Sequence, residues 1–215
     1  MNPLRKHILV VVFCVGAAVW SGCRRSPPVV GYYLTSTRDL AKLHRVVFLE
    51  LAERDSPPGI ARDTTIALTH AIQAKRLFDI DVINRDDPLC RMVRLDARGG
   101  FTMKQLRDMR ETFKCDGILI GEILNFRPYP SMQIGLKLQL MDLRDGRLVW
   151  GIDNVWDTRE KDIEERIRRF FNETIRYGYK PINWRIAMMS PKIFEKFVAF
   201  EAAETLSKVG ADDPE

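Results

Sequence analysis

The middle of the chain consists of short apolar runs separated by segments with helical periodicity. Arg45–Leu51 is a nearly continuous apolar run, which is typical of a strand covered on both faces. Apolar residues then recur at helical spacing from Ile60 to about Leu77, and Phe78–Asn84 is a second run of strand length. This pattern predicts a strand, a helix that crosses back over the sheet, and a second strand.

A second helix and a third strand are expected next along the chain. Thr102 and Gln105 have the spacing of a capping box, and they begin a helical pattern that ends at Phe113. The apolar run Gly117–Leu124 then predicts the third strand.

Two alternating runs give the clearest local pattern. Gln133–Asp142 and Arg147–Trp156 are joined by Leu143–Gly146, whose Asp-Gly pair supplies the positive φ angles that a tight hairpin turn requires. In the first run, apolar side chains share one face, while Lys137 and Gln139 lie on the other. The alternation predicts a hairpin in a sheet with one covered face and one wetter face.

Two further helices are expected after the hairpin. A helical pattern begins after Glu160 and ends at Gly178. The last helix begins at Ser190-Pro191 and runs to about Leu206. This last helix packs either on its own domain or on a partner.

These elements predict an α/β (α+β) fold. Its mixed sheet has about five strands, includes a C-terminal β-hairpin and is flanked by helices. The domain is expected over residues 45–180, and residues 181–215 form an appended C-terminal helix and tail. Residues 23–44 contain Pro27 and Pro28 and show no sustained period, so they are interpreted as a tether.

The N-terminus has the layout of an export signal. Arg5 and Lys6 form a positive region, and an uncharged, largely apolar run of 13 residues follows from Ile8 to Trp20. This run is shorter than the roughly 20 apolar residues of a membrane-spanning helix. The pattern therefore favours a signal peptide over an uncleaved anchor.

The end of this segment, Trp20-Ser21-Gly22-Cys23, resembles the lipobox of bacterial lipoproteins. The resemblance implies that residues 1–22 are removed by cleavage between Gly22 and Cys23, and that the Cys23 thiol is lipidated, with palmitate among its acyl chains. Several acyl chains make a stable membrane anchor. Arg24 follows the cysteine where lipoproteins kept at the inner membrane tend to have Asp, so the resemblance favours the outer membrane, facing the periplasm. Ordinary cleavage is the alternative.

The charge balance argues against a nucleic-acid partner. The chain has 34 basic and 29 acidic residues and a formal net charge of +5, which falls to +3 when the signal takes Arg5 and Lys6 away. Nucleic-acid binding would need a clustered basic stripe.

Two cysteines, Cys90 and Cys115, remain beyond Cys23. In an oxidising periplasm they either form a disulfide, which closes a loop of about 25 residues, or remain two half-buried thiols. Beyond the signal, the chain has only His44 and His70 as histidines and no CxxC spacing, so no metal and no cofactor are expected.

No pattern of catalytic residues stands out. The serines lack a nucleophile elbow, and no glycine loop for phosphate is present. The acidic pairs Asp79/Asp81 and Asp86-Asp87 fall at a strand end and a turn, where acids are common for solvation. We therefore expect no enzyme activity and infer no small-molecule substrate; an envelope enzyme is the remote alternative.

Two motifs resemble a lipoprotein superfamily. They are the strand Cys115–Ile123 (CDGILIGEI) and the hairpin Leu138–Trp150 (LQLMDLRDGRLVW). They resemble bacterial lipoproteins related to the curli secretion channel subunit, the lipoprotein activator of penicillin-binding proteins, and the N-terminal domain of the Tol translocation protein. The resemblance covers residues 45–156, roughly half of the chain. It implies structural roles, with Gly121 letting a helix approach the strand closely and Trp150 filling core.

The function expected from these patterns is a non-catalytic binding or assembly module of the cell envelope. It docks an envelope protein, or it self-associates into a ring or secretion-type assembly, as the resemblance to the channel subunit implies. Candidate partner-binding residues are Phe126, Arg127 and Tyr129 in a Pro-rich loop, and Phe194 and Phe197 on the last helix. Aromatic residues and arginine are enriched in interface hot spots. Alternatively, these side chains pack on their own domain.

Overall fold

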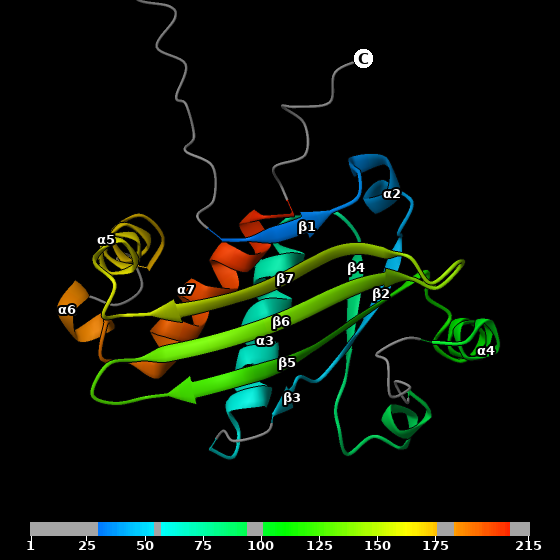
Figure 1. Ribbon diagram of the computed structural model, residues 1–215, viewed down its shortest axis with the longest axis horizontal. Helices are drawn as coiled ribbons and strands as arrows, with labels where there is room; N and C mark the ends of the chain where they lie inside the picture. The colour runs from blue at the N-terminus through cyan, green and yellow to red at the C-terminus, as the bar shows by residue number, and fades with distance from the viewer. Residues whose placement is uncertain (1–29, 54–56, 94–100, 176–182, 207–215) are drawn as a thin grey trace, which may run out of the picture.

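A seven-stranded mixed sheet forms the centre of the domain (Figure 1). The computed structural model describes residues 30–53, 57–93, 101–175 and 183–206. The strands, in chain order, are β1 (Tyr32–Leu34), β2 (Arg45–Leu49), β3 (Ala52–Glu53), β4 (Asp79–Ile83), β5 (Gly117–Arg127), β6 (Gln133–Asp142) and β7 (Leu148–Asp157). The hydrogen-bonded order is β1-β7-β6-β5-β2-β4, with β3 paired to β5. The expected α/β (α+β) fold is confirmed, with more strands than the five expected.

Helices cover both faces of the sheet. They are α2 (Thr37–Ala41), α3 (Ile60–Gln73), α4 (Met103–Phe113), α5 (Lys161–Phe170), α6 (Trp184–Ala187) and α7 (Pro191–Glu204), with a 3-10 helix at Pro88–Met92 and a π-helical turn at Phe171–Ile175. Figure 1 shows α3 and α7 behind the strands, whereas α4 lies at one end of the sheet. Among the described residues, no helix has the length and apolar character needed to cross a membrane.

The expected strand–helix–strand unit is confirmed. β2 pairs in parallel with both β4 and β5, so that Val47 lies between Asp81 and Ile118. α3 connects β2 to β4 and buries Leu68 and Ile72 against the sheet. This arrangement places α3 on what we call the inner face.

The capping box expected at the start of α4 is present. The backbone N–H of Gln105 donates to Thr102 Oγ1 at 3.3 Å, and the backbone N–H of Thr102 donates to Gln105 Oε1 at 2.8 Å. α4 ends at Phe113, as expected, and packs with Ile118 and Val47 in a second cluster, on the outer face. Local side-chain chemistry thus fixes where this helix begins.

The β6–β7 hairpin is also confirmed. Ladder pairs along it include Leu140 with Trp150 and Ile134 with Trp156. Gly146 has a φ of +75°, the left-handed conformation expected at this turn. Both tryptophans are fully buried on the inner face, so the predicted core role of Trp150 is confirmed.

The C-terminal helix α7 is an integral part of the inner layer. Its buried side chains join the same cluster as those of α3 and the β6–β7 hairpin. Trp156 Nε1 donates to Glu201 Oε2 at 2.7 Å, and Arg166 Nη1 lies 3.0 Å from the same carboxylate oxygen. Of the two placements expected for this helix, the structure has the one on its own domain.

The tether expected over residues 23–44 is folded from Val30 onward. β1 pairs antiparallel with β7, and Val30, Leu40 and Leu43 are buried. A strand of three residues is too short to show a period in the sequence. Pairing with β7, rather than a sequence pattern of its own, holds β1 in place. The signal peptide, Gly22 and Cys23 lie outside the described residues.

Gly121 has a different neighbour from the one the sequence suggested. A Cβ at this position would lie 2.6 Å from Lys137 O and from Leu138 Cδ2, and 2.9 Å from Leu51 Cδ2. The close approach is therefore to strand β6 and to a leucine that follows β2, not to a helix. The expectation of helix contact was wrong because antiparallel pairing with β6 fills the space above this residue.

Candidate functional site

α4 covers only one half of the outer face of the sheet. Leu106, Met109 and Phe113 of α4 pack over Val47 and Ile118, toward the β2 side. Beyond Ile120 of β5, the side chains of β5, β6, β7 and β1 that point to this face are not covered by any helix among the described residues. We call this surface the open face; its outward-facing residues are Tyr33, Glu122, Gly135, Lys137, Gln139, Gly151, Asp153 and Val155.

The prediction of one covered and one wetter face is confirmed along β6. Leu136, Leu138 and Leu140 are buried on the inner face, whereas Lys137 and Gln139 are half-buried on the open face. Side chains directly opposite one another in an antiparallel pair share a face. This rule extends the open face from β5 across β6 and β7 to β1.

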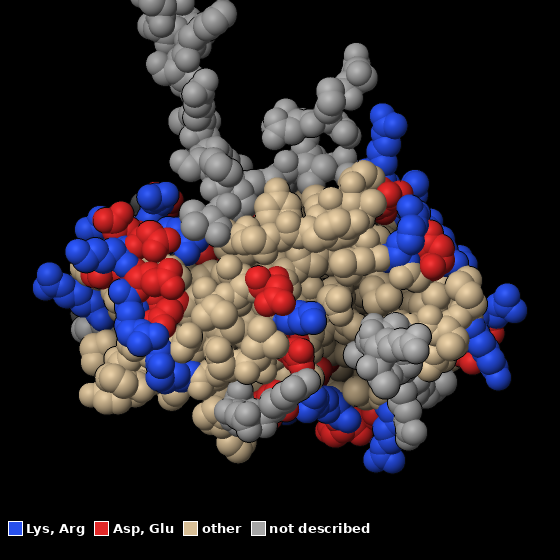
Figure 2. Space-filling view, viewed as in Figure 1, with Lys and Arg blue, Asp and Glu red and all other residues tan. Residues whose placement is uncertain are grey.

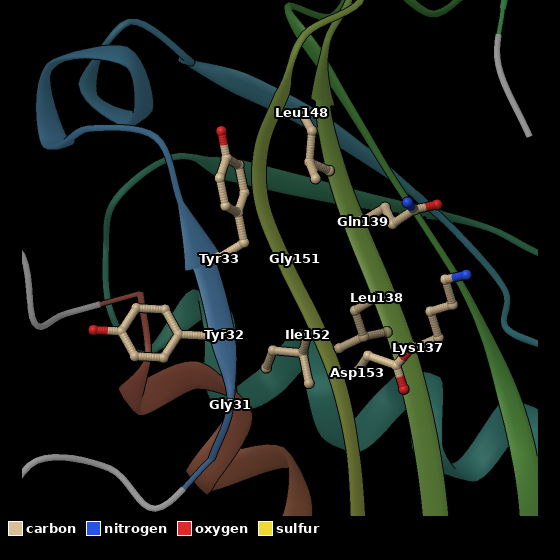
Figure 3. Close-up of a pocket in the computed structure, with 10 residues that line it drawn as sticks. All are labelled: Gly31, Tyr32, Tyr33, Lys137, Leu138, Gln139, Leu148, Gly151, Ile152 and Asp153. Atoms are coloured by element: carbon tan, nitrogen blue, oxygen red, sulfur yellow. The ribbon is translucent and has the colours of Figure 1, made fainter.

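A shallow groove of about 310 Å³ crosses the open face between β1 and β6 (Figure 3). Tyr33 borders it on the β1 side, Lys137 and Gln139 on the β6 side, and Leu148 at one end. Gly151 lies between them and is paired with both Tyr33 and Gln139. The groove therefore exposes the strand backbone between an aromatic ring and polar side chains.

Gly151 lies at the floor of the groove, where the strands are closely packed. A Cβ there would lie 3.2 Å from Leu138 O and 3.7 Å from Leu148 Cδ2. A glycine within a strand often marks a place where a ligand or another backbone approaches closely. Tyr33, 53% exposed, and Val155, 41% exposed, add accessible apolar area on the same face.

The charges of the open face lie together at its centre. Figure 2 shows a broad tan area that contains a small group of red and blue side chains, with further charged side chains gathered around the outer parts of the domain. The charged residues within the open face are Glu122, Lys137 and Asp153, which lie directly opposite one another on three strands. A surface of this kind suits contact with another protein better than attraction of a charged polymer.

Three of the predicted partner-binding residues lie where β5 ends: Phe126 and Arg127 are its last two residues, and Tyr129 lies in the loop that leads to β6. Tyr129 is 77% exposed, whereas Phe126 is half-buried against the core. Arg127 Nε donates to Ser131 O at 3.2 Å, and Arg127 Nη2 donates to Asp157 Oδ2 at 3.2 Å. Tyr129 is thus free for a partner, while Phe126 and Arg127 hold the loop to its own domain.

Asp157 stabilises this end of the sheet. Hydrogen bonds from Arg159, with Arg127 nearby, hold the pKa of the Asp157 carboxyl below its ordinary value. Arg159 Nε lies 3.0 Å from each carboxylate oxygen. The two arginines are thereby engaged in structural ion pairs.

Phe194 and Phe197 lie in the core. Each is 1% exposed, and their ring centroids are 6.3 Å apart. Phe197 also contacts Phe170 of α5, with centroids 5.8 Å apart. The expectation that these two rings bind a partner is corrected by this burial, because the apolar face of α7 is already covered by α3, α5 and the sheet.

Cys90 and Cys115 are free thiols, the second of the two alternatives that the sequence left open. Both pack in the cluster beneath α4, where Cys115 is buried and Cys90 half-buried. Burial, with Asp116 nearby, raises the pKa of the Cys115 thiol to about 11. A thiol in such surroundings stays protonated and unreactive.

A wider hollow of about 800 Å³ opens where β2 and β4 begin. Its polar side chains already pair with neighbours: Arg45 Nε lies 2.8 Å from Asp81 Oδ2, and His44 Nδ1 lies 3.5 Å from Asp116 Oδ2. No group of three or more possible metal ligands forms within the described part of the chain. The groove on the open face is therefore the stronger candidate site.

The groove residues were only partly predicted. The alternation in β6 indicated that Lys137 and Gln139 face away from the core, but Tyr33 and Gly151 were missed. The run Tyr32-Tyr33-Leu34-Thr35 is rich in residues that favour strands, and it follows Gly31. That signal was available but too short to stand out from the surrounding segment.

Comparison with protein-family models and with curated proteins gives no match. Among solved structures, the PelC dodecamer from Paraburkholderia phytofirmans is similar over 83% of this chain and 94% of its own, with 11% identity and a TM-score of 0.44. Lipoprotein GNA1162 from Neisseria meningitidis is similar over 52% of this chain and 78% of its own, with 9% identity and a TM-score of 0.36. The C-terminal domain of LpoB from Salmonella enterica covers 56% of this chain and 94% of its own, with 15% identity and a TM-score of 0.35.

Proposed function

We propose that the protein is a lipid-anchored component of the cell envelope and acts as a non-catalytic binding module through its open face. The observation that carries this proposal is the open face itself: half of one face of the sheet, which no described helix covers and on which apolar and polar side chains surround three charged residues. Tyr33 and Val155 give it accessible apolar area, and Gly151 gives it a bare backbone floor. Exposed apolar patches with a polar rim mark interaction sites.

The anchor in this proposal is Cys23. The export signal before it and the Ser21-Gly22-Cys23 sequence support cleavage and lipidation at this residue. Acyl chains contribute about 0.8 kcal/mol for each buried methylene, so several chains hold a protein on its membrane. Arg24 supports the outer membrane, with the domain in the periplasm.

The partner in this proposal is an envelope protein with a flat and largely uncharged surface. Lys137 lies between Glu122 and Asp153 across three strands, so the centre of the open face offers both signs of charge within a short distance. A partner that places a single polar group there, surrounded by apolar side chains, satisfies this pattern. Tyr129 at the end of the hairpin adds an accessible aromatic contact.

Self-association is the second candidate, and one observation favours it. β1 pairs only with Trp150–Ile152, so that Asp153–Asp157 of β7 has no strand partner on that side among the described residues. An unpaired strand edge can accept a strand from another copy. A contact between unlike surfaces of two copies would repeat from copy to copy, and it closes into a ring when the rotation between neighbouring copies allows it.

Photo-crosslinking in intact cells tests both versions. A photoreactive amino acid at Tyr33 or Val155 should give a discrete adduct, and the same group at Glu111, exposed on α4, serves as the matched control. The mass of the adduct distinguishes a second copy from another envelope protein. The substitution Gly151→Trp, which fills the groove, should weaken the adduct. Equal adducts at all three positions, or none at Tyr33 and Val155, would contradict a binding role for the open face.

A further inference from the structure

The link between Cys23 and the folded domain is short. Six residues, 24–29, separate Cys23 from Val30, which is 3% exposed and lies two residues before the start of β1. Seven residue steps reach at most about 25 Å, at 3.3–3.6 Å for each extended residue. A lipid on Cys23 therefore keeps Val30, two residues before β1, within that distance of the bilayer surface.

This reach is smaller than the domain. A folded unit of about 180 residues has a radius of gyration of about 16 Å, which corresponds to a diameter of about 40 Å. From β1 to β4 the sheet has five strand spacings, or about 24 Å. The β4 edge therefore reaches the membrane only if the link is fully extended along the whole width of the sheet, whereas β1 lies beside the anchor.

The side chains near β1 suit a membrane surface. Tyr32 and Tyr33 are 40% and 53% exposed, and they point to opposite faces of the strand. Tyrosine is enriched at membrane interfaces because its ring is apolar and its hydroxyl is wet. Figure 1 shows α2 beside β1 at the same edge, where Arg38 is exposed and Lys42 forms an ion pair of 2.8 Å with Asp39.

The opposite edge has a different character. β4 carries Asp79 and Asp81, both exposed, and Asp81 is paired with Arg45. Acidic side chains on an edge strand favour water and discourage further pairing. The two edges thus differ both in distance from Cys23 and in chemistry.

We propose that the edge formed by β1 and α2, called here the β1 edge, lies on the lipid headgroups of the membrane, with Tyr32 and Arg38 in contact. This proposal rests on the lipid anchor proposed above. In this orientation the sheet stands on the bilayer by its β1 edge, so that the open face is perpendicular to the membrane plane. A partner of the open face then approaches from the side, at the level of the membrane.

Fluorescence quenching from the membrane tests this orientation. The full-length lipidated protein, with Cys90→Ser to remove the half-buried thiol, is reconstituted in vesicles of phosphatidylethanolamine and phosphatidylglycerol that carry a nitroxide headgroup. One fluorophore is placed at Arg38→Cys on the β1 edge, and in a matched sample at Asp81→Cys on β4. Quenching should be severalfold stronger at residue 38; equal or weaker quenching there overturns the proposal.

A second label and a flotation assay complete the test. Thr35→Cys, also exposed near the β1 edge, should follow the behaviour of Arg38→Cys, and circular dichroism checks that each variant is folded. Protein that does not float with the vesicles overturns the anchor, and this orientation with it. Protein that floats but shows equal quenching at residues 35, 38 and 81 overturns the orientation alone.

Discussion

The indole N–H of Trp150 donates a hydrogen bond of 2.9 Å to Thr205 Oγ1, which joins the first part of β7 to the end of α7. Both residues are fully buried. The Thr205 hydroxyl in turn donates to Ala202 O at 2.7 Å, so its oxygen is oriented to accept from the indole. This contact ties the C-terminal helix to the hairpin that forms the open face.

Removal of this acceptor should destabilise the domain. Thr205→Val keeps the shape of the side chain but leaves the buried indole N–H without a partner, which costs about 1–3 kcal/mol of unfolding free energy. Urea unfolding measures the loss. Thr205→Ser, which keeps the hydroxyl and loses one methyl, should lose less; a larger loss for Ser than for Val would show that packing rather than the hydrogen bond dominates.

Gly121 should tolerate no side chain. A Cβ at 2.6 Å from Lys137 O, on the backbone of β6, forces the strands apart, and overpacking of this kind costs typically about 1–3 kcal/mol. Gly121→Ala should therefore lower the thermal midpoint clearly. Gly31→Ala is the matched control, because nothing lies within 4 Å of its added Cβ. Equal midpoints for the two variants would refute the close approach.

Glu195 should make stability depend on pH. It is 3% exposed on α7, and burial raises its carboxyl pKa from an ordinary 4.5 to about 7, with Asp63 of α3 adding repulsion and Lys192 opposing it. The folded state therefore holds a proton that the unfolded state releases. The stability from this group is complete below pH 4.5 and is lost as the pH rises through about 7.

Glu195→Gln removes this titration. Wild type should lose stability as the pH rises from below 4.5 to above 7, whereas the variant should not. The unfolding free energy of the variant minus that of wild type should therefore increase over this range. Glu111→Gln, at an exposed position on α4, should show a constant difference over the same range. A constant difference for Glu195→Gln as well would mean that this carboxyl does not titrate as its burial implies.

The elements predicted correctly from the sequence include those whose ends are determined by residues close together in the chain. Thr102 and Gln105 form their capping box from neighbouring residues, and Gly146 adopts the turn conformation that few other residues favour. Such features are encoded within four or five residues, so a single sequence is sufficient to find them. The fold class followed from their order along the chain.

Features that depend on distant pairing were missed or left open. β1 is held by Trp150–Ile152, more than a hundred residues away, and no pattern within Tyr32–Leu34 predicts that contact. The apolar spacing of Phe194 and Phe197 is the same whether α7 covers its own domain or a partner. The open face exists because α4 covers only the β2 side of the sheet, which only the three-dimensional packing reveals.

The most direct test of the whole account is metabolic labelling with palmitate in cells that produce the full-length protein. Wild type should incorporate the label and sediment with membranes, whereas Cys23→Ala should do neither. Equal labelling of the two proteins, or an unlabelled wild-type protein that still begins at Met1, would contradict the lipid anchor and the membrane orientation that depends on it.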